Sequence, residues 1–306
     1  MLNRTDIVYV YDGSYEGMLC CIFESFARKE IPFDIQSAAA QQLSLYPSLD
    51  IATDMAHAER VRSGIRRRIS EEAYALVELG YFTCHPQREQ LILDFVRLGM
   101  KYKQQTLSLL TNDTVRTLQR AVGHLTGESH QLKGFVRFSV HSGVLVAVIE
   151  PKNYVLPLLA PHFCDRYAND AFIIYDAAHG AMLAYRQGKS IITSAERFEQ
   201  PEPDAAEQQF RSLWKTFYNT IGIEQRYNPR CRMGHMQKRY WKHLTEMNPD
   251  VPARAASVEQ RLEAHRQERE EAGSCCLPEP FFPPPNCGIP EPRKPLPRSL
   301  PQDASE

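Results

Sequence analysis

Strand-forming residues are packed most densely between positions 132 and 167. Side chains of residues 135–140 alternate between the two faces of an extended chain, which predicts a strand with one solvated face. Residues 144–149 are almost wholly apolar, which is typical of a strand buried on both faces. A His-Ser-Gly sequence at residues 141–143 separates the two segments and forms the predicted turn. The pattern therefore predicts the central hairpin of a β-sheet.

Three further segments, at residues 7–11, 171–176 and 182–185, have the composition of strands. Together with the hairpin they predict a sheet of about five strands. Because hairpins dominate the second half of the chain, we expect the sheet to be mixed or antiparallel. Helical spacing of apolar positions between the first strand and the hairpin predicts a helical insert at about residues 55–125. Its last helix is expected to end near Leu125.

Residues 207–221 carry five large apolar side chains at intervals of three and four, which predicts a helix that covers the sheet. The fold class expected is therefore α+β, with flanking helices around the sheet. Beyond position 248 the pattern changes: residues 258–271 read as a charged helix, and ten of the 32 residues from 275 to 306 are proline. We expect a globular domain at 1–248 and a disordered Pro-rich tail within 249–306.

The chain has 36 basic and 37 acidic side chains, for a formal net charge of −1. This balance excludes a uniformly basic coat for nucleic acid but allows a local basic patch. The eight cysteines show no repeated CxxC spacing, and neither a signal run nor a membrane-length apolar stretch is present. We therefore expect reduced thiols, a cytoplasmic location, no membrane partner, no metal site and no cofactor.

Residues 226–243 form the strongest local patch, with six Lys or Arg, no acid and interleaved aromatic rings. Such a segment suits single-stranded or distorted nucleic acid, because cations contact phosphates and rings stack on bases. The alternative is that the aromatic residues anchor the core and the cations are only solvated. The candidate contacts are Arg226, Arg230, Arg232, Lys238, Arg239, Tyr240, Trp241 and Lys242.

A second basic patch is predicted on the helix at residues 55–68, whose apolar face turns most of its arginines outward. Its candidate phosphate contacts are Arg60, Arg62, Arg66 and Arg67, and a merely solvated face is the alternative. Catalytic candidates are weaker: His162, Asp12 and Asp176 carry suitable side chains, but capping or phosphate contact explains His162 better, and turn chemistry explains Asp12 and Asp176 better. Arg166, four residues after His162, is a further candidate for phosphate contact.

Several segments, in order along residues 5–247, carry a family resemblance: YDGSYEGMLCCIFESF, RVRSGIRRRIS, LKGFVRFSV, IEPKNYVLPLLAPHFCDRY, FIIYDAAHGAMLAY and the stretch from WKTFYNTIG to YWKHLTEM. They resemble a bacterial domain-of-unknown-function family whose members are named as DNA metabolism or DNA repair proteins. The element HF-x-x-R matches His162, Phe163 and Arg166, and the family's basic-aromatic block matches Arg226, Arg239, Tyr240 and Trp241. Lys238 stands where the family commonly has a proline.

In this family the domain accompanies a radical SAM protein in DNA modification or repair, and in some members it is fused to a uracil-DNA glycosylase-like domain. The resemblance therefore implies a role in DNA metabolism. This chain shows neither the cysteine cluster of radical SAM enzymes nor a glycosylase motif, so the resemblance implies the stand-alone companion. The expected function is an accessory factor that binds single-stranded or damaged DNA. Two alternatives remain open: an enzyme acting on a nucleotide or damaged base, and a scaffold that recruits partners through its Pro-rich tail.

Overall fold

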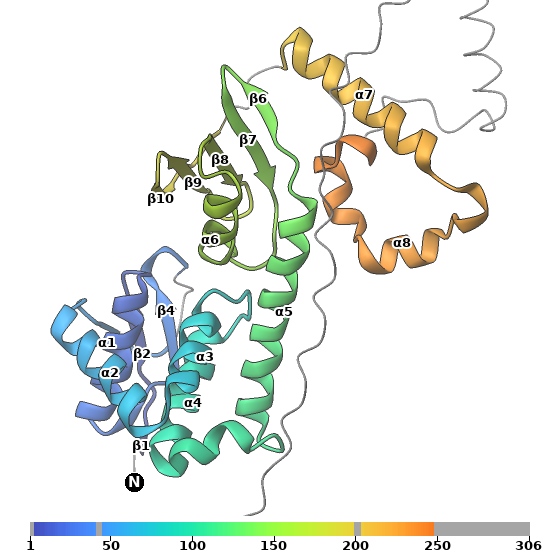
Figure 1. The fold of residues 1–306 in the computed structure, drawn as a ribbon. Coiled ribbons are helices and arrows are strands. Elements are labelled where there is room, and N and C mark those ends of the chain that lie inside the picture. Colours follow the sequence, from blue (N-terminus) through green and yellow to red (C-terminus); the bar gives the residue numbers. More distant parts are fainter. Residues whose placement is uncertain (1–2, 41–44, 199–202, 248–306) are drawn as a thin grey trace, which may run out of the picture. The chain divides into compact units, whose positions relative to one another are not determined.

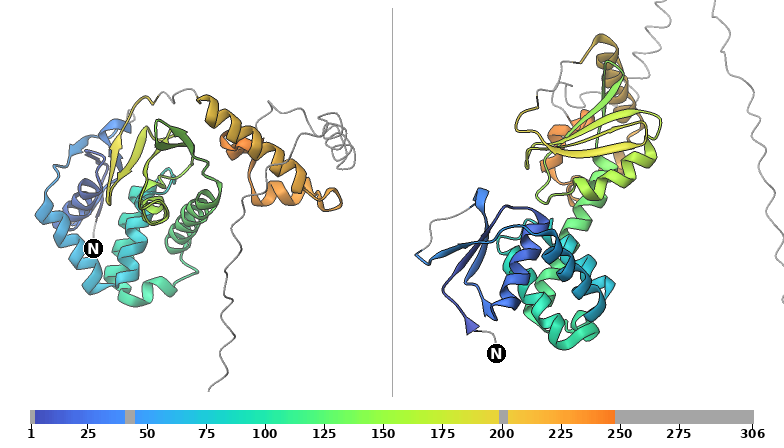
Figure 2. Two further views of the ribbon diagram at one scale, coloured as in Figure 1. Left: turned by 45° about the horizontal axis from the view of Figure 1, so that its top comes forward. Right: turned by 90° about the vertical axis from the view of Figure 1, so that its left-hand side faces the viewer.

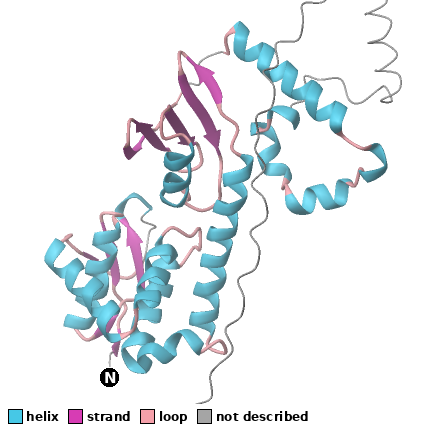
Figure 3. Ribbon diagram, in the orientation of Figure 1, coloured by secondary structure: helices cyan, strands magenta, loops and turns pink. Residues whose placement is uncertain are grey.

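The structure is a computed structural model that describes residues 3–40, 45–198 and 203–247 (Figure 1). The predicted charged helix and Pro-rich tail lie outside these residues. The described chain contains many helices together with a three-stranded and a mixed five-stranded sheet (Figure 3), so the α+β class predicted from the sequence is confirmed. None of the described helices combines the length and the apolar character that crossing a membrane requires.

The first sheet is parallel, with β2 (Val8–Tyr11) between β4 (Asp34–Ser37) and β5 (Ser48–Asp50). All four residues of β2 are buried. A small parallel pair, β1 (Asn3–Arg4) with β3 (Glu30–Ile31), lies outside this sheet. We expected the first strand to join the five-stranded sheet, and this was wrong: β4 and β5 occupy both edges of β2, so no edge remains for another strand.

The helix α1 (Tyr15–Ala27) follows β2 and begins at Ser14, whose hydroxyl accepts a hydrogen bond from the Gly17 N–H at 2.9 Å. The predicted helical insert is present, with side-chain caps from Asp54, Ser70 and Asn112 at three helix starts. Its elements are α2 (Met55–Arg68), α3 (Glu71–Tyr81), α4 (Arg88–Tyr102), the 3-10 segment η2 (Lys103–Ser108) and α5 (Asp113–Phe135). Apolar faces of α1 to α5 build one buried cluster with the first sheet.

The helix α5 is longer than predicted, because it continues past Leu125 to Phe135. Leu125 and Leu132 are both buried and lie seven residues apart, so the helical spacing that buries the first half of α5 persists in the second half. This part of α5 packs against α6 (Leu156–Arg166) and contributes to a second buried cluster. The strand expected to begin at Phe135 is correspondingly short.

The second sheet has the order β10-β9-β8-β7-β6. Its strands are β6 (Ser139–His141), β7 (Val144–Ile149), β8 (Ala171–Asp176), β9 (Ala181–Arg186) and β10 (Lys189–Ser194). Only the β7–β8 pair is parallel, and α6 connects these two strands; the other neighbours are antiparallel. The predicted mixed sheet of five strands is thus confirmed, although β10 takes the place expected for the first strand. Two further views of both sheets are given in Figure 2.

The predicted hairpin turn between β6 and β7 is also confirmed. Ser142 has a φ of 49° and Gly143 a φ of 80°, so both central residues adopt the left-handed conformation. Two consecutive left-handed residues match the right-handed twist of the flanking strands, which is why such turns connect hairpins. Glycine at the second position adopts this conformation without the steric cost that a side chain carries.

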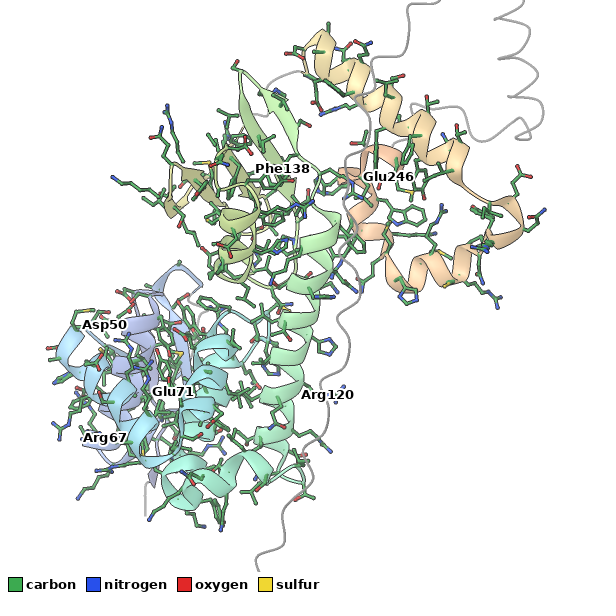
Figure 4. The ribbon with its side chains drawn as sticks, viewed as in Figure 1. Asp50, Arg67, Glu71, Arg120, Phe138 and Glu246 are labelled. Atoms are coloured by element: carbon green, nitrogen blue, oxygen red, sulfur yellow. The ribbon has the colours of Figure 1, made fainter. Side chains whose placement is uncertain are left out.

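The helix α7 (Ala205–Ile221) forms as predicted, but its expected role of covering the sheet was wrong. Phe210 is 69% exposed and Phe217 is 52% exposed, so its apolar face does not contact the sheet. Polar contacts attach α7 instead: Glu207 accepts a hydrogen bond from the Val140 N–H at 3.1 Å, and Trp214 donates one at 3.0 Å to Glu246, which is labelled in Figure 4. The spacing of apolar residues identified a face of the helix but not its partner.

Candidate nucleic-acid interface

The basic segment, residues 226–243, folds into short helical pieces joined by turns. Asn228 begins α8 (Pro229–His235) by accepting a hydrogen bond from the Cys231 N–H at 3.0 Å, and Pro229 occupies the first helical position, where no N–H is needed. The 3-10 segments η3 (Glu224–Arg226), η4 (Lys238–His243) and η5 (Thr245–Met247) complete this part of the chain. The segment therefore offers side chains from several turns rather than from one long helix.

Tyr240 anchors the basic segment in the second buried cluster. It is 3% exposed, and its hydroxyl donates a hydrogen bond to the Glu128 carboxylate at 3.1 Å. Burial raises the pKa of Tyr240 to about 12, so the hydroxyl keeps its proton for this bond. Tyr240 is a core residue in this conformation, which removes it from the predicted stacking surface.

Glu128, on α5, is the polar centre of this anchor. Its carboxylate accepts hydrogen bonds from the backbone N–H groups of Lys152 at 3.0 Å and Asn153 at 2.9 Å, and forms a salt bridge of 2.7 Å with Arg239. Burial by itself would raise the pKa of the Glu128 carboxyl, but these hydrogen bonds and the Arg239 charge outweigh it, so the pKa lies below its ordinary value. The charge of Arg239 is therefore largely occupied within the protein.

Four cations of the basic segment have no acidic partner within the part of the chain that the structure describes: Arg226, Arg230, Arg232 and Lys238. Lys242 differs, since it pairs with Glu150. A guanidinium or ammonium without a carboxylate partner remains available to a phosphate.

Aromatic rings lie among these free cations. The Arg232 guanidinium is 5.0 Å from the ring centre of Trp241 and 5.4 Å from that of Tyr227, while the Lys238 ammonium is 6.0 Å from Trp241. Tyr227 is 56% exposed and Trp241 is partly exposed. Rings and cations in one place are what stacking on unpaired bases and contact with their phosphates require.

The arginines predicted on α2 have mixed surroundings. Arg62 forms salt bridges with Glu59 at 2.7 Å and Glu16 at 3.3 Å. The Arg66 guanidinium lies 3.2 Å from Glu71, and the Arg60 guanidinium lies over the ring of Phe23. These three arginines already have partners within the protein. The alternative prediction, a solvated face, therefore describes most of this helix.

Among the four predicted arginines of α2, Arg67 is the one with neither an ion pair nor a ring contact among the described residues, and it is exposed (Figure 4). It lines a hollow of about 480 Å³ at the ends of α2 and α4 together with Arg68, Lys101 and Lys103. None of these four cations forms an ion pair with another described residue. We call this feature the basic hollow. Cations at helix C-termini also complement the helix dipole, which is a structural reason for part of the cluster.

The two basic regions pack against different neighbours. The helix α2 contacts α1, α3 and α4, whereas η4 contacts β7 and η5. Within the described ranges no hydrogen bond, ion pair or ring contact joins α2 to the basic segment. They are therefore two separate basic surfaces, each with four unpaired cations.

The catalytic candidates do not form a common site. Asp12 accepts hydrogen bonds from Ser14 Oγ at 2.6 Å and Thr53 Oγ1 at 2.8 Å, in the turn before α1. Burial is the largest single influence on Asp12 and by itself would raise its pKa, but the hydrogen bonds from Ser14 and Thr53 together outweigh it, so the pKa lies below the ordinary value. His162 lies on α6 edge-on to Phe163. Arg166, at the end of the same helix, lies over the ring of Tyr167.

Asp176, the third candidate, forms a pair that the sequence showed only as a turn. It is fully buried, and its carboxylate lies 2.7 Å from Nδ1 of His179. The same carboxylate accepts the backbone N–H groups of Ala178 at 3.0 Å and His179 at 3.2 Å. These bonds close the turn between β8 and β9, so turn chemistry accounts for the pair.

A cavity of about 520 Å³ lies beside the anchor of the basic segment. Its walls come from the loop after α3, one face of α5, the loop at residues 152–153, and Gln237 and Arg239 of the basic segment. Cys84, His85, His124 and Lys152 line the cavity, and none of them was among the candidate site residues predicted from the sequence. Two glycines four residues apart, Gly123 and Gly127, were the available signal. Among the described residues no group of three His, Cys, Asp or Glu side chains is placed to hold a metal ion.

The fold and these sites describe an α+β domain with a basic, aromatic-bearing C-terminal segment held on a buried carboxylate. Residues 86–246, more than half of the chain, match the family model of the domain of unknown function DUF4130. The chain belongs to this family. The matched region contains α4, α5, the five-stranded sheet and the basic segment, whereas the first sheet and α2 precede it. Comparison with curated proteins and with solved structures gave no match.

Proposed function

We propose that this protein binds single-stranded or locally unpaired DNA through the basic segment. The supporting observation is that two cations without an acidic partner among the described residues, Arg232 and Lys238, lie over the exposed ring of Tyr227 and the partly exposed ring of Trp241. Arg226 and Arg230, in the same segment, also lack an acidic partner among the described residues. Cations neutralise the strand's phosphates and displace its counterions, while the rings stack on bases that are not paired. Because the whole chain has a formal charge of −1, the attraction to phosphates comes from the local basic patches and not from the net charge.

The choice of DNA, and the role in which it is bound, draw on the resemblance to the family of DNA metabolism proteins. The proposed role is that of an accessory factor in DNA repair or modification, acting beside a radical SAM or glycosylase-type partner. The basic hollow at Arg67 supplies a second set of phosphate contacts in this proposal, because its four cations also have no acidic partner among the described residues.

Fluorescence anisotropy of labelled oligonucleotides tests the proposal. Single-stranded and duplex DNA of equal length are titrated with the protein at several salt concentrations. We expect tighter binding to the single strand, since only unpaired bases expose their faces to the rings. The four unpaired cations of the basic segment predict a slope of about −3 in log affinity against log salt, and contacts from the four cations of the basic hollow would bring it to about −6. Folded protein that shows no salt-dependent binding contradicts the proposal.

The Arg120→Ala variant is a matched control for loss of an exposed arginine. Arg120 lies on α5 (Figure 4), is exposed and has no ion pair among the described residues, like Arg230. It is outside both basic surfaces. Its removal should leave the affinity and the slope unchanged, whereas removal of Arg230 should weaken binding.

A further inference from the structure

The cavity beside the basic segment has the dimensions of a small-molecule site. Its volume of about 520 Å³ falls within the range of roughly 300–1,000 Å³ that ligand pockets occupy. Four segments distant in the sequence meet around it, two of them loops and one the face of α5. The shape therefore depends on the folded domain and is held by the hydrogen bonds of Glu128.

The charges on the cavity wall favour an anion. Among the described residues of the wall, Glu128 carries the only carboxylate, and its oxygens already accept bonds from two backbone N–H groups, the Asn153 amide, Tyr240 and Arg239. Lys152 is exposed and has no acidic partner within the described residues. The wall therefore presents one uncompensated positive charge, since the charges of Glu128 and Arg239 balance each other.

Hydrogen-bond donors add to this preference. The Nδ1 atom of His85 accepts a hydrogen bond from the Gln87 N–H at 3.2 Å, which leaves the proton of its neutral ring on Nε2 as a donor. Gln131 and Gln237 contribute amides that both donate and accept, as the edges of nucleobases require.

The face of α5 in the cavity has glycine at two positions one turn apart, Gly123 and Gly127, beside the side chains of His124, Glu128 and Gln131. We call the surface at these two glycines the bare face of α5. A Cβ atom added to Gly123 or Gly127 would meet nothing within 4 Å, so neither glycine is needed for packing. Gly80 and Gly99 differ, because a Cβ there would come within 2.8 Å of Leu118 and 2.2 Å of Ile69 respectively. Glycine within a helix is less favourable than alanine, so the bare face calls for another reason. An open, flat surface for a planar ligand is such a reason.

From these observations we infer that the cavity binds one nucleotide unit, with its phosphate at Lys152 and its base over the bare face of α5. Gln237 and Arg239 flank Lys238, whose ammonium lies over the ring of Trp241, so the cavity adjoins the surface proposed to hold the strand. The inference that the base comes from a bound DNA strand rests on the proposed function. Bases withdrawn from a strand are held in this way, by stacking and by hydrogen bonds to their edges.

Free ligands test the cavity without a strand. Isothermal titration calorimetry with the four deoxynucleoside 5′-monophosphates is compared with the matching nucleosides and with inorganic phosphate. We expect saturable binding of at least one monophosphate, and binding at least tenfold weaker for its nucleoside and for phosphate alone. If no monophosphate binds the folded protein, or if inorganic phosphate binds as well as the nucleotides, the inference is wrong.

The Gly127→Leu variant fills the cavity from the helix side, and Gly134→Leu is its matched control. Gly134 is also on α5 with open space around it, but it lies outside the cavity. We expect Gly127→Leu to abolish monophosphate binding and Gly134→Leu to leave it unchanged, with circular dichroism showing the same helix content in both. Undiminished binding by folded Gly127→Leu would overturn the assignment, and Lys152→Ala, expected to weaken binding about tenfold, decides the case if that variant fails to fold.

The two proposals fail in different ways. Monophosphate binding without salt-dependent strand binding would refute the basic segment and keep the cavity. Strand binding by the wild type, with no monophosphate binding and with an unchanged strand affinity in Gly127→Leu, would refute the cavity and keep the basic segment.

Discussion

The Glu128 carboxylate on α5 and the Arg239 guanidinium in η4 lie 2.7 Å apart, with side chains only 3% and 27% exposed. This salt bridge joins a helix of the core to the segment that carries most of the candidate contacts. Because Tyr240 and two backbone N–H groups bind the same carboxylate, loss of its charge would leave several buried donors poorly satisfied.

We therefore predict that Glu128→Gln lowers the free energy of unfolding by about 2–3 kcal/mol, since breaking a buried pair leaves the other charge uncompensated and Arg239 is only partly screened by solvent. Urea denaturation followed by circular dichroism measures it. The control is Glu59→Gln, which breaks the Arg62 pair where the Glu59 side chain is 56% exposed and should therefore have a much smaller effect on stability. Equal effects of the two variants would show that Glu128 is not the anchor of the basic segment.

The same carboxylate makes stability depend on pH. Hydrogen bonds and charges hold the pKa of Glu128 and Glu246 below the ordinary value of 4.5, although burial opposes this. Between the folded and unfolded pKa values the unfolded state binds more protons, so stability is complete above about pH 4.5 and is lost as the pH falls through the folded values. We expect the melting temperature to drop in this acid range, and to drop less steeply in Glu128→Gln. Parallel curves for both proteins would contradict this role for Glu128.

The sequence predicted the local elements of this fold well where one repeating pattern decided them. The apolar run at β7, the turn at Gly143 and the helical spacing of α7 each depend on neighbours close in the chain. The pairing of β2 with β4 and β5 depends instead on which edges meet in space. That choice leaves no periodic mark on the sequence, which is why the first strand was placed in the wrong sheet.

The candidate site shows the same limit. Composition identified the basic segment, but it did not separate Arg239, which is bound to Glu128, from Arg230, which has no acidic partner among the described residues. Glu128 stands within an ordinary helical sequence, and its partners come from residues 152–153 and 239–240. A buried carboxylate of this kind is recognised only once the chain is folded.

Salt dependence should distinguish the free cations of the basic segment from the paired ones. Each single-strand phosphate contact contributes about 0.7 to the slope of log affinity against log salt. We expect Arg226→Ala with Arg230→Ala to reduce the slope by about 1.4 and to weaken binding for all sequences alike. Lys242→Ala removes a cation that Glu150 already neutralises, and should change the slope by less. A larger effect of Lys242→Ala than of the double variant would contradict this assignment.

The basic hollow permits a separate test of the second surface. Arg67→Ala with Lys103→Ala removes two of its four cations, neither of which pairs with a described acid. If the hollow contacts phosphates, the slope should again fall by about 1.4. The Arg62→Ala variant on the same helix serves as the control, because Arg62 is already paired with Glu59 and Glu16. An unchanged slope in the double variant would confine DNA binding to the basic segment.

Replacement of a helix glycine by alanine should change the free energy of unfolding in opposite directions at Gly127 and Gly99. Gly127→Ala adds a Cβ in open space and removes the conformational freedom of a helix glycine, so we expect the free energy of unfolding to rise by about 0.5–1 kcal/mol. Gly99→Ala places a Cβ 2.2 Å from Cδ1 of Ile69, which is 1% exposed, and should lower it by about 1–3 kcal/mol through overpacking. Urea denaturation of both variants gives the sign directly. Destabilisation by Gly127→Ala would mean that the bare face of α5 is needed for packing, and the nucleotide assignment would lose one of its supports.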